Sequence, residues 1–297
     1  MNQDRKNYIG GSDIPAILGI SRWKTQLQLW AEKTGEVDVE DISHIEAVEL
    51  GTELEDFVAK KFERKTGMKV RRAPKLYAHK IFSYMGCQVD RLVEGTDELL
   101  ECKTCSAWKA KEWEGEEIPM EYIAQVMWQL GITGRKIGHI AVLIGGQSFK
   151  YKKIYFDEAM FGAMVAKAVK FMIMVKEKTA PMAVGADNAF IQELLPESDG
   201  EIQEANDLND KVAYRQELKM HVSELMGQLD TIEAEIKQAI GEHKGIKTDQ
   251  YIVTWTPQQR SYVDTEKLKA EGLYEKYSTI KSSRVMRVTK NKEKDNG

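Results

Sequence analysis

The run LLECKTC, residues 99–105, places charged side chains inside an otherwise strand-like segment. Side chains on a strand alternate between its two faces, so Glu101 and Lys103 share one face while Cys102 points to the other. A buried strand normally excludes charged side chains, so these two indicate a functional site. An acidic and a basic group side by side can hold a cation and orient a water molecule, as a hydrolytic site requires.

A second carboxylate lies in the preceding strand-like run, GCQVDRLV. The sequence EGTDE between the two runs is typical of a tight turn. If the turn is centred on Gly95 and Thr96, Asp90 falls directly opposite Glu101 on the neighbouring strand. Cross-strand partners lie about 5 Å apart at Cβ, a distance at which two carboxylates can hold one divalent cation.

Two facing carboxylates are unfavourable unless one is protonated or a cation lies between them. Mg²⁺ fits this donor set best, because it prefers oxygen ligands, keeps several waters and commonly uses carboxylates together with a substrate phosphate. Mn²⁺ is expected to substitute for it. Lys103 would lie beside the metal-bound water, where it could orient the nucleophile or offset charge on the phosphate. The spacing is a loose pattern, and a surface hairpin with an ordinary Glu–Lys ion pair is the alternative.

Cys102 and Cys105 form a C-x-x-C pair, which at first sight suggests zinc or redox chemistry. A structural zinc or iron–sulfur site needs about four ligands, and the only other cysteine is Cys87. We therefore expect Cys102 to face the core. Trp108 and Trp113 follow this strand and could contact DNA, but packing against the sheet is the more frequent role of such residues.

The overall composition is that of a globular protein. Its 297 residues, 42% of them hydrophobic and 8% aromatic, can build a substantial core. No run of about 18 uncharged apolar residues occurs and the N-terminus is polar, so we expect a cytoplasmic protein that does not associate with membranes. The formal charge of −4 does not favour nucleic-acid binding by itself, but basic residues cluster at 60–75, 150–153 and 281–292.

Apolar spacing and cap residues define the elements that must position the charged side chains. Ser12 is placed to cap a short helix that ends near Gly19. Further helices are expected at 25–33, 46–66, 119–130 and 157–178, and strands at 69–72, 83–93, 99–103, 136–144 and 148–156. The helix at 46–66 carries an apolar stripe of Leu50, Leu54, Phe57, Val58 and Phe62. We therefore predict a mixed α/β (α+β) fold in which a short twisted sheet is flanked by helices.

A change in composition indicates further parts of the chain. We expect a first domain at 1–185, a helical arm at 186–245 and a small C-terminal unit at 246–297. The arm has apolar residues at heptad spacing, alternating steps of three and four: Leu218, Val222, Leu225, Leu229, Ile232, Ile236 and Ile240. It could form a coiled coil between chains or fold back on its own domain. The last unit suggests a few strands, within 250–264 and at 282–288, and a disordered basic tail from Lys290.

The order of these motifs resembles the PD-(D/E)xK nuclease superfamily, and more narrowly the phage-type exonucleases of the lambda exonuclease and YqaJ viral recombinase family. Four motifs carry the resemblance: GTELE with Glu55, GCQVD with Asp90, LECK with Glu101 and Lys103, and YIAQ with Tyr122 and Gln125. The family also has an arginine followed seven residues later by a serine at a helix start, which Arg5 and Ser12 match. The proline of the superfamily name is Val89 here, and the last hundred residues have no counterpart in lambda exonuclease.

The resemblance implies a restriction-endonuclease-like core and a set of residue roles. These are metal ligation by Asp90, Glu101 and the Cys102 carbonyl, metal support by Glu55, positioning of the attacking water by Lys103 and Gln125, and DNA-phosphate binding by Arg5 and Ser12. A phosphate at a helix start is physically sensible, because free N–H groups there favour an anion.

The implied activity is Mg²⁺-dependent digestion of double-stranded DNA from a 5′ end, which leaves a 3′ single strand for a phage annealing protein. A homo-oligomer is compatible with the resemblance. Two alternatives stay open. One is an endonuclease that uses the same residues without needing a DNA end, and the other is a non-catalytic DNA-binding or assembly protein in which the heptad arm is the working part.

Overall fold

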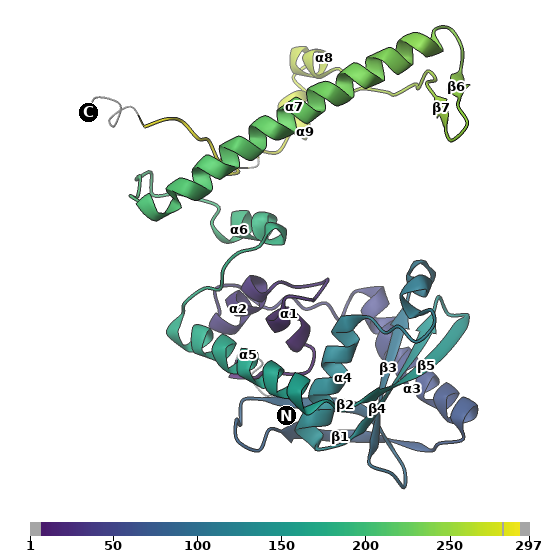
Figure 1. Cartoon of the computed structure of the whole chain (residues 1–297). Helices are drawn as coiled ribbons and strands as arrows, with labels where there is room; N and C mark the ends of the chain where they lie inside the picture. The colour runs from purple at the N-terminus through teal and green to yellow at the C-terminus, as the bar shows by residue number, and fades with distance from the viewer. Residues whose placement is uncertain (1–6, 281, 292–297) are drawn as a thin grey trace. The chain divides into compact units, whose positions relative to one another are not determined.

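The computed structural model describes residues 7–280 and 282–291 of the chain (Figure 1). The chain divides into two compact units, the first ending at Leu194 and the second beginning at Leu195. The predicted finer division, with boundaries at 185 and 245, stays a prediction. Most of the predicted basic tail, from residue 292 onward, lies outside the described residues.

A five-stranded sheet with the strand order β1-β2-β3-β4-β5 forms the centre of the first unit. Its strands are β1 (Val70–Ala78), β2 (Gly86–Val93), β3 (Glu98–Cys105), β4 (Ile137–Ile144) and β5 (Ser148–Tyr155). β3 and β4 pair in parallel, and the other neighbouring strands pair antiparallel. A parallel pair needs a crossover connection, which η2 (Ala107–Trp113) and α4 (Met120–Thr133) provide. This mixed sheet with flanking helices confirms the predicted fold class.

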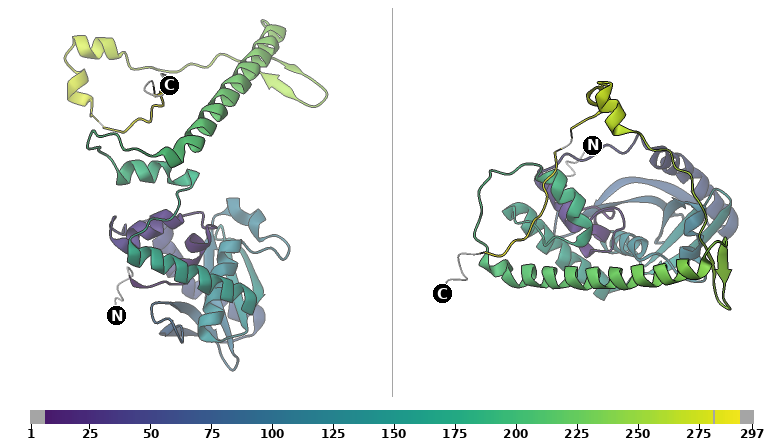
Figure 2. Two further views of the ribbon diagram at one scale, coloured as in Figure 1. Left: turned by 60° about the vertical axis from the view of Figure 1, so that its left-hand side comes forward. Right: turned by 90° about the horizontal axis from the view of Figure 1, so that it is seen from above.

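Helices cover both faces of the sheet (Figures 1 and 2). On one face, α3 (Glu46–Thr66) packs through Val58 and Phe62 into a small core that includes Leu100. A larger core on the other face contains Leu99 and is built with α1 (Ile14–Leu18), α2 (Gln26–Thr34), α4 and α5 (Glu158–Glu177), which η3 (Gly185–Asp187) and α6 (Asn188–Leu194) follow. Neighbouring β3 residues thus point to opposite faces, as predicted.

The helix α3 has the predicted bounds and ends at Gly67, whose φ of 76° is the left-handed geometry of a C-terminal cap. Its apolar stripe is shorter than predicted. Leu54 packs against the small core, but Leu50 and Phe57 are exposed. The fully buried residues of α3 all lie in its second half. The first half of this helix therefore faces the sheet with polar side chains, and two of them, Glu55 and Asp56, contact β2 at the candidate site.

The second unit contains one long helix, α7 (Asn209–Ile240), preceded by the short turn η4 (Asn206–Leu208). Two short strands, β6 (Gly245–Lys247) and β7 (Ile252–Thr254), pair antiparallel, and two short helices follow, α8 (Thr265–Ala270) and α9 (Tyr274–Tyr277). β7 confirms a strand within 250–264, whereas the strand predicted at 282–288 is wrong, since these residues have no regular structure. None of the helices in residues 7–280 and 282–291 combines the length and the apolar character that a membrane span requires.

Candidate active site

The β2–β3 hairpin has the register that the turn sequence predicted. Arg91 pairs with Leu100, and Leu92 pairs with Leu99, around a turn in which Gly95 has a φ of 71°. Continued by one step, this register puts Asp90 opposite Glu101. The strand pairing ends before this step, and Oδ2 of Asp90 instead accepts a hydrogen bond at 2.8 Å from the main-chain N–H of Cys102. The Asp90 carboxylate is thereby fixed against β3.

Glu101 is almost fully buried, with 3% of its side chain exposed, and both of its carboxylate oxygens have partners. Its Oε1 atom lies 2.6 Å from Nζ of Lys103 and accepts a hydrogen bond at 2.6 Å from Nε2 of Gln125. Its Oε2 atom accepts a hydrogen bond at 2.7 Å from Nε2 of Gln129. Three donors from β3 and α4 therefore hold one carboxylate in a single orientation.

Gln129 was missed by the sequence reasoning, although a signal existed. It follows Gln125 by four residues on α4, and residues at that spacing lie on the same side of a helix. Its amide also donates to the main-chain carbonyl of Gln88 at 3.0 Å, so it ties β2 to the carboxylate on β3. The Oε1 atom of Gln129 is buried, and no protein group donates to it within the described residues.

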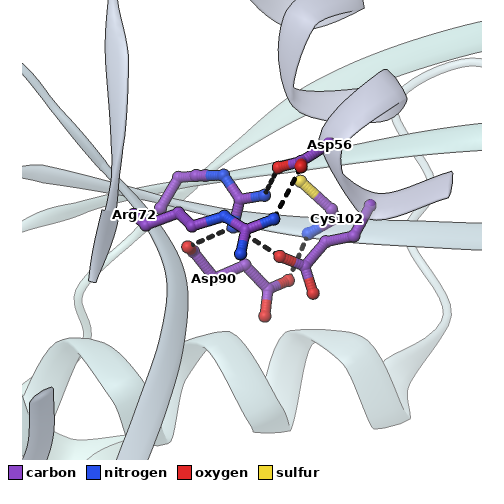
Figure 3. A network of polar contacts seen from close by, with 6 residues as sticks. Asp56, Arg72, Asp90 and Cys102 are labelled. Atoms are coloured by element: carbon purple, nitrogen blue, oxygen red, sulfur yellow. Dashed lines mark hydrogen bonds and ion pairs between the residues drawn. The ribbon is translucent and has the colours of Figure 1, made fainter. Parts of the chain in front are cut away.

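Arg91 was missed as well, and its hydrogen bonds connect the hairpin to α3. Figure 3 shows this network, with Asp56, Arg72, Asp90 and Cys102 labelled. The Arg91 guanidinium, with 5% of the side chain exposed, donates from Nη1 to Glu55 and to the main-chain oxygen of Asp90, the latter at 2.6 Å. Its Nη2 atom donates to Asp56 at 2.5 Å, and Arg72 donates to the same carboxylate at 2.6 Å. Glu55 is thus held by an arginine, and its negative charge adds to the raised pKa of Asp90. Its predicted support of a metal stays a prediction.

The electrostatics of the site leave one negative charge in need of a partner. Burial raises the pKa of Asp90 to about 8, the charge of Glu101 adds to this effect, and the Cys102 N–H and Lys103 offset it only in part. Burial alone would lower the pKa of Lys103, but attraction to Glu101 outweighs it and the pKa is raised. Lys103 and Glu101 thus form a stable ion pair, while Asp90 requires a proton or a cation.

The donor set fits a hard divalent cation. Asp90 and Glu101 present carboxylate oxygens from neighbouring strands, and the main-chain carbonyl of Cys102 directly follows Glu101 in the sequence. Within the part of the chain that the structure describes, no three His, Cys, Asp or Glu side chains are grouped to enclose a metal. Such a two-carboxylate arrangement suits an ion that keeps waters and takes further ligands from its substrate.

A cleft of about 450 Å³ opens beside these residues. Lys103 and Gln125 line it together with Tyr122, and residues of the N-terminal region, including Ser12 and Trp23, line it as well. The structure therefore brings Ser12 into the same cleft as two of the predicted catalytic residues. Arg5, its predicted partner in phosphate binding, lies outside the described residues.

The predicted capping role of Ser12 is wrong. α1 begins at Ile14 with Asp13 at the cap position, and no side chain caps it. The Asp13 carboxylate turns back to accept a hydrogen bond from the Gly10 N–H at 3.0 Å, and it also pairs with Lys33 at 2.9 Å. Ser12 is one residue too early to cap the helix and is exposed in the cleft.

Cys102 and Trp113 pack inside the first unit, whereas Trp108 lies on its surface. Cys102 packs against the small core beneath α3, as predicted, and all three cysteines are free. Trp113 is buried and stacks on Tyr122 at 5.5 Å between ring centroids, whereas Trp108 is 95% exposed. Nζ of Lys103 lies 5.4 Å from the ring centroid of Tyr122. Trp113 therefore supports the wall of the cleft from within.

Comparisons with known proteins agree with this architecture. Residues 2–136 match the family model described as a YqaJ-like viral recombinase domain. The protein described as uncharacterized protein YqaJ, from Bacillus subtilis (strain 168), is 36% identical over 284 residues, which cover 92% of this chain and 88% of that protein.

Among solved structures, the alkaline exonuclease LHK-Exo from Laribacter hongkongensis aligns with a TM-score of 0.50 and 19% identity, covering 59% of this chain and 90% of that chain. The structure of LHK-Exo in complex with dAMP aligns with the same TM-score and coverage at 21% identity. These similarities confirm the fold that the sequence predicted.

Proposed function

Since the chain belongs to the YqaJ-like viral recombinase family, we propose that it is a metal-dependent nuclease of phage recombination that hydrolyses phosphodiesters in double-stranded DNA. The observation that carries the proposal is the convergence of Asp90, Glu101 and Lys103 at one end of the β2–β3 hairpin, next to an open cleft. The solved structures with this fold include an alkaline exonuclease, and one of them was determined with dAMP. These similarities support a nuclease.

Mg²⁺, with Mn²⁺ as a substitute, is the cofactor that the donor set favours. Asp90, Glu101 and the main-chain carbonyl of Cys102 would hold it. When bound, such an ion lowers the pKa of a water molecule and polarises a phosphoryl oxygen. The protein's part is to keep the two carboxylates in place, which the Cys102 N–H does for Asp90 and the two glutamines of α4 do for Glu101.

Lys103 and Gln125 are the residues we assign to positioning the attacking water. Both touch Oε1 of Glu101 and both line the cleft, so their remaining donor atoms are available where substrate enters. Lys103 carries a positive charge that would offset charge developing on the phosphate. Glu55 supports the site from α3, and it does so through Arg91, which also holds the main-chain oxygen of Asp90.

For the direction of digestion we propose 5′ to 3′ from a duplex end, with the 3′ strand left for a phage annealing protein in the cytoplasm of a bacterial host. Ser12 in the cleft, together with Arg5, would bind the phosphate of that end. The Ser12 hydroxyl is free of a capping role, since α1 begins beyond it. An exposed hydroxyl in the cleft is compatible with phosphate binding.

The decisive experiment compares end-labelled linear duplex with covalently closed circles, each with Mg²⁺ and with chelator. We expect nucleotides or short products from the linear duplex with Mg²⁺, no reaction on the circles, and no reaction with chelator. Nicks on closed circles would favour an endonuclease. Binding of duplex without cleavage under every metal condition would overturn the nuclease and leave a DNA-binding protein.

A further inference from the structure

The long helix α7 carries an apolar stripe that the second unit leaves uncovered. Figure 2 shows α7 as one uninterrupted helix. Five of the stripe residues are between 44% (Leu218) and 62% (Leu225) exposed, the others being Val222, Leu229 and Ile232. Among the described residues from Leu195 on, the other α-helices are α8 and α9, of 6 and 4 residues, which are too short to cover it.

The spacing of the stripe identifies the kind of partner that fits it. Apolar residues recur at alternating steps of four and three from Leu218 to Ile236, which keeps them on one seam of a helix wound at 3.5 residues per turn. Val222, Leu229 and Ile236 then occupy the first core position of the heptad, and Leu218, Leu225 and Ile232 the second. A seam of this period is complementary to another helix of the same period.

The charges beside the seam favour a second copy of α7 in the opposite direction. In an antiparallel pair centred on Gly227, equivalent flanking positions face each other, so Lys219 faces Glu233 of the second copy and His221 faces Glu235 of the second copy. Two-fold symmetry repeats each pair. In a parallel pair the facing residues are His221 with Met226 and Gln228 with Glu233, which offers no ion pair.

We propose that the protein forms a homodimer through an antiparallel coiled coil of α7. The inference rests on the helix and its sequence, and it does not depend on nuclease activity. The core of the coil is made by the six seam residues of each chain, and its direction is selected by the Lys219–Glu233 pairs. Because the two helices run in opposite directions, the first units of the two chains connect to opposite ends of the coil.

Sedimentation of the full-length protein tests the association. We expect a concentration-dependent monomer–dimer equilibrium between about 1 and about 100 µM. Leu225→Asp, in the seam, should shift the protein to monomer. Met220→Glu is the matched control, since Met220 is also an exposed apolar residue of α7 but lies outside the seam, and it should leave the equilibrium unchanged. A monomer at every concentration, or a trimer, would overturn the proposal.

Charge reversal tests the direction of the coil. Lys219→Glu or Glu233→Lys alone places like charges against each other, and each should weaken self-association about tenfold. A mixture of the two single variants forms opposite-charge pairs at both sites and should restore association between differently tagged chains. The intrahelical pair of Glu233 with Lys237 is lost only in the Glu233→Lys chains, and mixing them with Lys219→Glu chains does not rebuild it, so this pair cannot account for a restoration. Equal association of the pure and mixed samples would rule out the antiparallel pairing.

Discussion

The amide of Gln129 donates a hydrogen bond to Oε2 of Glu101 at 2.7 Å, and through the Gln88 carbonyl it joins β2 to the same carboxylate. We predict that Gln129→Ala weakens Mg²⁺ binding about tenfold and slows cleavage, because groups that orient a metal ligand typically have effects of this size. Metal titration followed by cleavage rates at saturating Mg²⁺ measures both effects.

The matched control for this variant is Gln88→Ala. Gln88 has an exposed side chain, and its contribution to the network is a main-chain carbonyl that the substitution keeps. We expect normal metal binding and normal cleavage. Equal effects of the two substitutions would show that Gln129 acts only through local packing.

Asp90→Asn tests the metal site with little change in structure. The asparagine oxygen can still accept the hydrogen bond of the Cys102 N–H, so the free energy of unfolding should stay near that of the unchanged protein. Loss of the charge should reduce Mg²⁺-dependent cleavage more than about a hundredfold. Asp97→Asn, at a 97% exposed side chain on the same hairpin, serves as the control. A folded Asp90→Asn variant that digests duplex DNA at the usual rate would refute the assignment.

Arg91→Met should lower the free energy of unfolding by about 2 kcal/mol, because Arg91 is buried while its carboxylate partners are partly exposed to solvent. Arg72→Met is the comparison, since Arg72 is exposed and pairs with the same Asp56, and a change below about 1 kcal/mol is expected. Urea unfolding of both variants measures the difference. A smaller loss for Arg91→Met than for Arg72→Met would contradict the organising role of Arg91.

Mg²⁺ binding should depend on pH through Asp90. Burial beside Glu101 raises the pKa of Asp90 to about 8, so at neutral pH the metal-free protein carries a proton there. A proton and a cation compete for the same oxygens. The affinity should therefore rise by up to about tenfold per pH unit below pH 8 and level off above it. Calorimetry in two buffers of different ionisation enthalpy should show proton release at pH 7, and an affinity that is flat from pH 6 to 8 would contradict this.

The sequence was most informative where the structure depends on residues that are close together in the chain. The turn at 94–98 sets the hairpin register, and the register alone puts Asp90 opposite Glu101. The bounds of α3 followed in the same way from its periodicity and from Gly67. These features needed no knowledge of what packs against them.

The residues that were missed depend on long-range packing. Arg91 became important because Glu55 and Asp56, in the polar first half of α3, reach a guanidinium that lies far away in the sequence. Gln129 depends on which side of α4 meets the sheet. The helix cap predicted at Ser12 is wrong by one residue, because Asp13 occupies the cap position. The Asp13 carboxylate contacts Gly10 and Lys33 instead of capping the helix.

The parallel pairing of β3 with β4 constrains how the site can vary. Glu101 and Lys103 of β3 are in register with Ile140 and Val142 of β4. β4 is buried from Gly138 to Ile144. Inserting a single residue within β3 would turn every following side chain to the opposite face and carry Lys103 under α3. Homologous chains should therefore tolerate substitutions along β3, while the number of residues in β3 stays the same.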